Sequence, residues 1–321
     1  MSSSNMSYST LLQRIHKGLS TIEIVHTSHP RWPLPSHSAT LAPAVHISVL
    51  DSSFNPPTLA HLALANTLPP PPTDVPPEGA PNEFDARLLL LSVRNADKQL
   101  KPGDAAYEQR TEMMILLARD LARTHARSVP AAEADVHGLP GAEAEAEHEP
   151  NVAVAIIDEP TFVGKSAILH DFLTSRIAAL LGPAAPSTPI LPSPKLTFLM
   201  GTDTVTRLFA PRYYASEAAM HTALHRFFSP DGDDSRIVCA RRASQGVPRA
   251  EEERVEVEMA AFVRTIIPFE RLAFVDIGER EATYSSSQVR ELRAKGDERW
   301  KEMATPAVAE YIVANDLYLT S

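Results

Sequence analysis

The sequence has one cysteine, no long apolar run and an excess of negative charge, and each of these features argues against a class of protein. Its 321 residues include a single cysteine, Cys239, which excludes an intrachain disulfide and a zinc site built from cysteines. One cysteine also favours a reducing compartment, cytoplasmic or nuclear. No apolar run is long enough to cross a bilayer, so we expect a soluble protein with no membrane partner. The formal charge of −10 disfavours nonspecific binding to nucleic acid.

Apolar runs and helical patterns alternate along the chain. Strands are expected at 45–50, 87–93, 152–157, 196–200, 236–240 and 271–277, and helices at 59–66, 107–124, 165–181, 251–265, 286–294 and 306–315. Because the apolar runs are continuous, the strands should be buried on both faces. The alternation predicts an α/β fold with a doubly wound, Rossmann-like parallel sheet that binds ligands at the carboxyl ends of its strands. No Gly-x-Gly-x-x-Gly follows the first strand, which argues against a dehydrogenase.

The domain is expected to cover 41–321, after an N-terminal extension at 1–40. In that extension, four apolar residues have helical spacing and favour a packed helix from Tyr8 to Leu19 over a transit peptide: Leu11, Leu12, Ile15 and Leu19. Three segments rich in proline, or in alanine and glutamate, are expected to be flexible surface insertions: 69–81, 130–150 and 182–194.

One loop carries most of the chemistry in the sequence. It follows the first expected strand and reads Asp51-Ser52-Ser53-Phe54-Asn55-Pro56-Pro57-Thr58-Leu59-Ala60-His61. A strand, a tight loop, a histidine and a helix direct backbone N–H groups and an imidazole at one point, which suits a phosphate. Taken alone, the pattern also fits an ordinary loop with a half-buried histidine.

Two further motifs follow in order. Phe198-Leu199-Met200-Gly201-Thr202-Asp203 is a strand that ends in Gly-x-Asp, where a carboxylate can accept hydrogen bonds from ribose hydroxyls; a simple turn is the alternative. Tyr284-Ser285-Ser286-Ser287-Gln288-Val289-Arg290 has capping-box spacing, so a helix begins there. Its hydroxyls, N–H groups and arginine suit a triphosphate, although a capped surface helix has the same pattern.

In this order, the motifs resemble those of the nucleotidyltransferase superfamily, and most closely the eukaryotic nicotinamide mononucleotide adenylyltransferases, whose first motif reads Gly-Ser-Phe-Asn-Pro-x-Thr-x-x-His. The resemblance spans 45–320 and departs at Ser52 and Ala60, where glycines are usual in the family or in the general motif. Trp32 and Trp300 are out of register with the family tryptophan that stacks on the substrate ring.

The resemblance implies transfer of the AMP moiety of ATP to nicotinamide mononucleotide, which gives NAD and pyrophosphate. Magnesium would arrive with ATP, without a metal site built by the protein. The catalytic residues implied are His61, Lys98 (with Lys101 as the alternative lysine) and Arg290. The ATP-binding residues implied are Ser53, Phe54, Thr58, His61, Gly201, Asp203, Ser286, Ser287 and Arg290. The acceptor-binding residues implied are Asn55, Phe162, Tyr213, Tyr214 and Arg242.

Two other functions stay open. A related nucleotidyltransferase or an ATPase could use another acceptor, and a degenerate scaffold could bind nucleotides or protein partners without turnover. The departures at Ser52 and Ala60 and the missing tryptophan motivate the scaffold. Retention of His61, Ser286, Ser287 and Arg290 argues against it. The sequence does not identify a protein partner.

Overall fold

The computed structural model of the protein describes residues 7–37, 42–69, 83–94, 101–128, 151–182, 191–241, 249–267 and 270–319. Its strands are β1 Ile22–Thr27, β2 Ala44–Asp51, β3 Ala86–Ser92, β4 Val152–Ile157, β5 Ser193–Gly201, β6 Arg236–Ala240 and β7 Leu272–Val275. Its α-helices are α1 Tyr8–His16, α2 Leu59–Ala65, α3 Tyr107–Ser128, α4 Phe162–Leu181, α5 Thr202–Leu208, α6 Glu217–Phe228, α7 Arg249–Ile266, α8 Ser286–Ala294 and α9 Pro306–Ala314. Short 3₁₀ turns lie at η2 Pro211–Tyr213, η3 Glu281–Thr283 and η4 Glu298–Met303.

The strands form one sheet in the order β1-β4-β3-β2-β5-β6-β7. All neighbours are parallel except β1, which pairs antiparallel with β4 at one edge. Without β1, the chain order of the parallel strands across the sheet is 3-2-1-4-5-6, so the winding reverses between β2 and β5. The predicted doubly wound α/β fold is confirmed. Ligands of such sheets bind at the carboxyl ends of the strands at this reversal.

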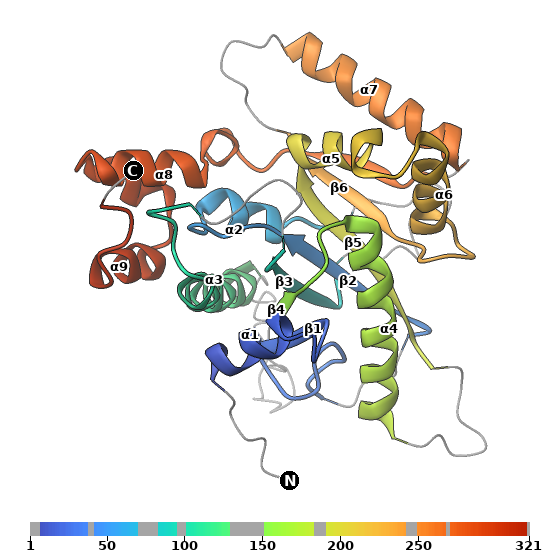
Figure 1. Cartoon of the computed structure of the whole chain (residues 1–321), viewed down its shortest axis with the longest axis horizontal. Coiled ribbons are helices and arrows are strands. Elements are labelled where there is room, and N and C mark those ends of the chain that lie inside the picture. The colour runs from blue at the N-terminus through green and yellow to red at the C-terminus, as the bar shows by residue number, and fades with distance from the viewer. Residues whose placement is uncertain are drawn as a thin grey trace, which may run out of the picture.

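Both faces of the sheet are covered by helices (Figure 1). Val45, Ile47 and Val49 of β2 point to a core that includes side chains of α4, α5, α6 and α7. Leu50 points to the opposite core, which is closed by α1, α2 and α3. This alternation explains why the apolar runs are continuous, because each strand must supply two cores. A third cluster joins α3 to α8, η4 and α9, and contains the fully buried Trp300.

The expected strands and helices are present, with boundaries shifted by a few residues. β1, α5 and α6 were not predicted. The N-terminal helix ends at His16, and Leu19, which was expected to pack, is 66% exposed. β5 begins at Ser193, two residues inside the predicted insertion 182–194. Most of the three predicted insertions lies outside the described residues. The helices that the structure describes include none long and apolar enough to cross a membrane.

Candidate functional site

Two adjoining cavities open at the carboxyl ends of β2 and β5, where the winding reverses. The larger has a volume of about 360 Å³ and extends from the loop after β2 to the N-terminus of α8. The smaller has a volume of about 170 Å³ and extends from the same loop to the N-terminus of α4 and to η2. The residues that line both cavities are Asp51, Ser52, Ser53, Thr204 and Arg207. A ligand in one cavity would therefore meet a ligand in the other at this shared wall.

His61 lines the larger cavity and is held by its own helix start. The Thr58 N–H donates to His61 Nδ1 at 3.0 Å, and Thr58 Oγ1 lies 2.8 Å from the same nitrogen. Because Nδ1 accepts a backbone N–H, the proton of the neutral ring is on Nε2. His61 Nε2 lies 2.9 Å from Ser52 Oγ and donates to it. The imidazole is thus fixed with a donor directed at the residue that replaces the family glycine.

The loop that precedes His61 is fastened by Asn55. The Asn55 amide donates to Asp104 Oδ1 at 2.6 Å, and its Oδ1 accepts from the Ala105 N–H and the Tyr318 hydroxyl. Burial opposes ionisation of Asp104, but hydrogen bonds from the Lys101 N–H and the Asn55 amide, with nearby Arg110, hold the pKa of this carboxyl below its usual value. The side chain of Asn55 is therefore occupied by protein groups that keep the loop in place.

The N-terminus of α8 meets this loop from the other side of the larger cavity. Ser285 caps the helix by accepting from the Gln288 N–H at 3.2 Å, as the capping-box spacing predicts. Ser286 Oγ donates to Pro56 O at 2.7 Å, and Arg290 Nη1 donates to Asn55 O at 2.5 Å. These contacts bring two serine hydroxyls, a guanidinium and a helix N-terminus to the cavity that contains His61. Such a set of donors suits an anion.

The end of β5 supplies the opposite wall. Gly201 ends the strand and is the N-cap of α5, which places Asp203 in the first turn of that helix. Gly201 and Asp203 line the larger cavity, and Arg207, one turn further along α5, lines both cavities. The Asp203 carboxylate belongs to the wall formed by α5, where it could accept hydrogen bonds from a sugar.

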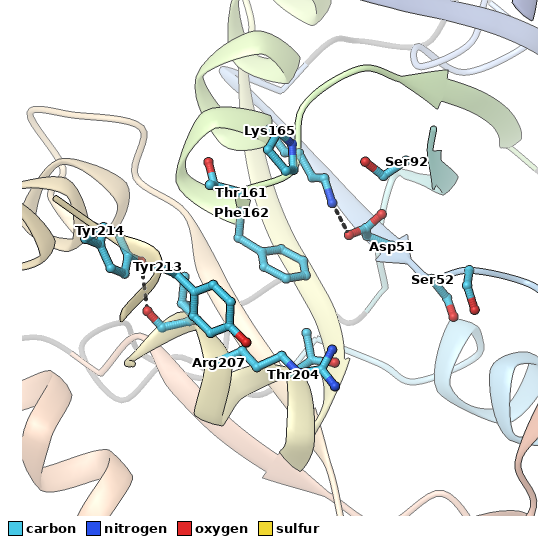
Figure 2. Close-up of a pocket in the computed structure, with 13 residues that line it drawn as sticks. Asp51, Ser52, Ser92, Thr161, Phe162, Lys165, Thr204, Arg207, Tyr213 and Tyr214 are labelled. Atoms are coloured by element: carbon cyan, nitrogen blue, oxygen red, sulfur yellow. Dashed lines mark hydrogen bonds and ion pairs between the residues drawn. The ribbon is translucent and has the colours of Figure 1, made fainter. Parts of the chain in front are cut away.

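The smaller cavity has aromatic and charged walls (Figure 2). Phe162 begins α4, with its ring perpendicular to that of Phe198 at a centroid distance of 6.0 Å. Tyr213 lies across the cavity, with the Arg212 guanidinium 5.0 Å from its ring centroid, so a flat ligand would use the other face. The Tyr214 hydroxyl donates to Leu208 O at 2.8 Å, and burial raises its pKa to about 12. Tyr213 is thus the better placed of the two tyrosines to contact a ligand.

No family model matches the chain. The chain is 26% identical over 264 residues to a Schizosaccharomyces pombe protein named "Putative nicotinamide mononucleotide adenylyltransferase", across 81% of this chain and 80% of that protein. This chain is adenylyltransferase-like in sequence. The match confirms the resemblance that the three motifs indicate. In two solved structures, Plasmodium falciparum nicotinic acid mononucleotide adenylyltransferase is complexed with NaAD or with APC. They align at TM-scores of 0.43 and 0.42 with 13% and 11% identity, covering 86% of this chain and 98% of theirs.

The residues that the adenylyltransferase resemblance assigns to ligands fall into three groups. The residues that line the cavities are Ser53, His61, Phe162, Gly201, Asp203, Tyr213, Tyr214, Ser286, Ser287 and Arg290. Phe54, Asn55 and Thr58 belong to the loop but are buried and line neither cavity. Lys98 and Arg242 lie outside the described residues, while the alternative Lys101 is exposed beside Asp104. The ligand roles of all these residues stay predictions.

Several residues of the cavity walls were not predicted from the sequence, among them Thr204, Arg207, Asp51 and Lys165. Thr204 and Arg207 follow Asp203 on α5, and Arg207 shares a helix face with Asp203 because the two are four residues apart. That spacing was a usable signal. Asp51 and Lys165 form an ion pair in the wall of the smaller cavity, between residues 114 positions apart. The local sequence around either residue does not predict that pairing.

Three carboxylates of the described chain line the larger cavity: Asp51, which is paired with Lys165, Asp203 and Glu281. Within the described part of the chain, no group of three or more His, Cys, Asp or Glu side chains could hold a metal ion by itself. Magnesium commonly takes one or two protein carboxylates and completes its shell with substrate phosphates and water. The donor set of the larger cavity therefore fits a magnesium ion that arrives with a nucleotide.

Proposed function

We propose that this protein transfers the AMP moiety of ATP to the 5′-phosphate of nicotinamide mononucleotide, which gives NAD and pyrophosphate. The observation that carries the proposal is the pair of adjoining cavities. The larger has the donors that a triphosphate needs, and the smaller has the aromatic walls that a pyridine ring needs. The sequence match to an adenylyltransferase supports the same reaction.

The triphosphate of ATP would bind between α8 and His61. Ser287 and the N–H groups at the start of α8 would donate to phosphate oxygens, as would Ser286 once its hydroxyl turns from Pro56 O. Arg290 would neutralise charge one turn further along the helix. The adenosine would then extend toward the end of β5, where Asp203 accepts from the ribose hydroxyls. This orientation directs the α-phosphate toward the wall that the two cavities share.

In the transfer step, an oxygen of the acceptor phosphate attacks the α-phosphorus of ATP. The bond from that phosphorus to the bridging oxygen breaks, and pyrophosphate leaves with the bond electrons. No covalent enzyme intermediate is needed, because the two substrates are reactive once they are aligned. The chain's own contribution is alignment and donation to developing charge, with His61 Nε2–H beside the shared wall and Arg207 facing both cavities.

Magnesium bound to the phosphates would neutralise further charge on the leaving group. Of the three carboxylates that line the larger cavity, Asp203 and Glu281 could complete its coordination, because Asp51 is paired with Lys165. We place the reaction in the cytoplasm or nucleus, since the single cysteine favours a reducing compartment.

The direct test incubates the purified protein with ATP, magnesium chloride and nicotinamide mononucleotide. NAD and pyrophosphate are both quantified. We expect them in equal amounts, and no pyrophosphate when the mononucleotide is omitted. Release of ADP or AMP without NAD would favour the ATPase alternative. Binding of ATP without any product from a panel of mononucleotides would favour the scaffold. Either result contradicts the proposal.

A further inference from the structure

The wall of the smaller cavity contains an ion pair for which the transfer step has no use. Lys165, in the first turns of α4, and Asp51, the last residue of β2, approach to 2.5 Å between Nζ and Oδ2. Their side chains are only 4% and 8% exposed, and Figure 2 shows them meeting at the edge of the cavity. Taking two charges out of water is unfavourable, so a buried pair is weak evidence of a stabilising role. A pair that also lines a cavity is a candidate for recognising what enters it.

The pair has unused hydrogen-bonding capacity on both sides. An ammonium has three N–H donors, and among the described residues Asp51 is the single hydrogen-bond acceptor that Lys165 Nζ reaches. The ring of Phe162 also lies beside this ammonium, with its centroid 4.8 Å from Nζ. The Asp51 carboxylate likewise has lone pairs beyond the one that accepts from Lys165. The cavity therefore presents a donor and an acceptor side by side.

A carboxamide is the complement of that arrangement. Its carbonyl oxygen can accept from Lys165, while its NH₂ group donates to Asp51, and the site keeps a net charge of zero. A carboxylate in the same place would bring a second negative charge beside Asp51, where little water remains to screen the repulsion. The pair thus favours the amide by attraction and rejects the acid by repulsion, the two components of specificity.

We propose that Asp51 and Lys165 recognise the substituent of the acceptor's pyridine ring, and select a mononucleotide that bears a carboxamide over one that bears a carboxylate. This inference rests on the proposed transfer reaction. Figure 2 shows the Phe162 ring between the pair and the opposite wall formed by Tyr213 and Arg207. A pyridine ring against Phe162 would direct its substituent to the pair and its ribose phosphate to the part of the shared wall formed by Thr204 and Arg207.

The test measures kcat/KM with nicotinamide mononucleotide and with nicotinic acid mononucleotide, at saturating ATP. Wild-type protein should prefer the amide by roughly tenfold or more, the effect expected when a buried like charge is avoided. Asp51→Asn keeps the shape, removes the negative charge and adds an N–H donor. We expect it to shift the ratio at least tenfold toward the acid, because Lys165 is then unopposed.

The matched control is Asp234→Asn. Asp234 lies before β6, at the opposite end of the sheet from both cavities, and forms ion pairs with Lys195 at 2.5 Å and with Arg271 at 2.6 Å. The backbone of Asp234 has a positive φ of 49°, which asparagine tolerates. This variant should leave the acceptor ratio unchanged. Calorimetric binding of both mononucleotides to each protein, with a nonhydrolysable ATP analogue present, provides a second readout.

Each outcome decides the inference. Equal use of the two acceptors by the wild type, or an Asp51→Asn ratio equal to that of the wild type, overturns it and leaves the transfer reaction standing. If Asp51→Asn does not fold, the wild-type ratio still decides. Absence of dinucleotide from both acceptors overturns the transfer reaction and the inference together.

Discussion

The Thr58 N–H determines which ring nitrogen of His61 carries the proton. With Nδ1 held by the Thr58 N–H, the imidazole presents an N–H at Nε2 without having to ionise. Ser52 Oγ accepts that N–H at 2.9 Å, and a phosphate oxygen could take its place when ATP binds. The departure from the family glycine at Ser52 therefore adds a polar partner for His61. The serine does not disturb the two contacts of Thr58 that hold His61 Nδ1.

Replacement of His61 by alanine should lower turnover on the order of 10²-fold or more with the fold intact, because one donor to developing charge is lost. The measurement is kcat for NAD formation, with the melting temperature of each protein recorded beside it. His225→Ala is the matched control, since His225 is exposed on α6. A folded His61→Ala protein that turns over like the wild type would remove His61 from the catalytic residues.

The two tyrosines of the smaller cavity should respond differently to substitution. Tyr213→Ala should raise the KM for nicotinamide mononucleotide several-fold through loss of about 1 kcal/mol of ring contact. The KM for ATP should not change, and Tyr213→Phe should behave as the wild type. Tyr214→Ala should instead lower the melting temperature, because its ring packs on the core and its hydroxyl is bound to Leu208 O. An unchanged acceptor KM in Tyr213→Ala would show that this ring does not contact the acceptor.

For single residues, the sequence predicts those roles that depend on neighbours within the same motif. His61, Ser286, Ser287 and Arg290 lie within motifs whose spacing carries their chemistry, and the cavity walls include all four. The partners of Asn55 are 49 residues away at Asp104 and 263 away at Tyr318. Sequence spacing cannot reveal such partners. A residue that holds the loop and one that holds a ligand therefore look the same in the sequence.

A helix or strand could be predicted when its hydrophobic pattern in the sequence was strong. The central strands are buried on both faces and read as continuous apolar runs, whereas β1 buries only its first residue fully and gives little signal. α6 did have a signal, because its buried residues Met220, Leu224, Phe227 and Phe228 follow helical spacing. α8 was predicted to the residue, because its start is marked by a capping box as well as by its periodicity.

Two N-cap serines allow the role of α8 to be tested against an equivalent helix. Ser285 caps α8 and Ser216 caps α6, each accepting one backbone N–H, at 3.2 and 3.1 Å. Alanine at either position should cost about 1 kcal/mol of stability. Only Ser285→Ala should also raise the KM for ATP, because Ser286 and Ser287 begin the helix that it caps. Equal KM values in the two variants would mean that α8 does not position the triphosphate.

For the whole molecule, alternation of strand and helix was enough to predict the doubly wound sheet, and the reversal of winding between β2 and β5 places the cavities. Pattern alone could not predict how the C-terminal region closes the site. α8, η4 and α9 pack on α3 around Trp300, and the chain then returns to the loop after β2. There, the buried Tyr318 hydroxyl donates to Asn55 Oδ1 at 2.8 Å. The end of the described chain thus fastens the loop that carries His61.

Tyr318→Phe removes the hydroxyl that donates to Asn55 Oδ1 and keeps the aromatic ring. Loss of one buried hydrogen bond should cost about 1 kcal/mol of stability and leave Asn55 Oδ1 with the Ala105 N–H as its remaining donor. Since Asn55 holds the loop before His61, kcat should fall by several-fold as well. Tyr311→Phe is the control, because the Tyr311 hydroxyl bonds Glu112 on α3 and does not contact the loop. We expect it to lower the melting temperature with kcat unchanged. Equal kcat in the two variants would show that the C-terminal contact stabilises the fold without positioning His61.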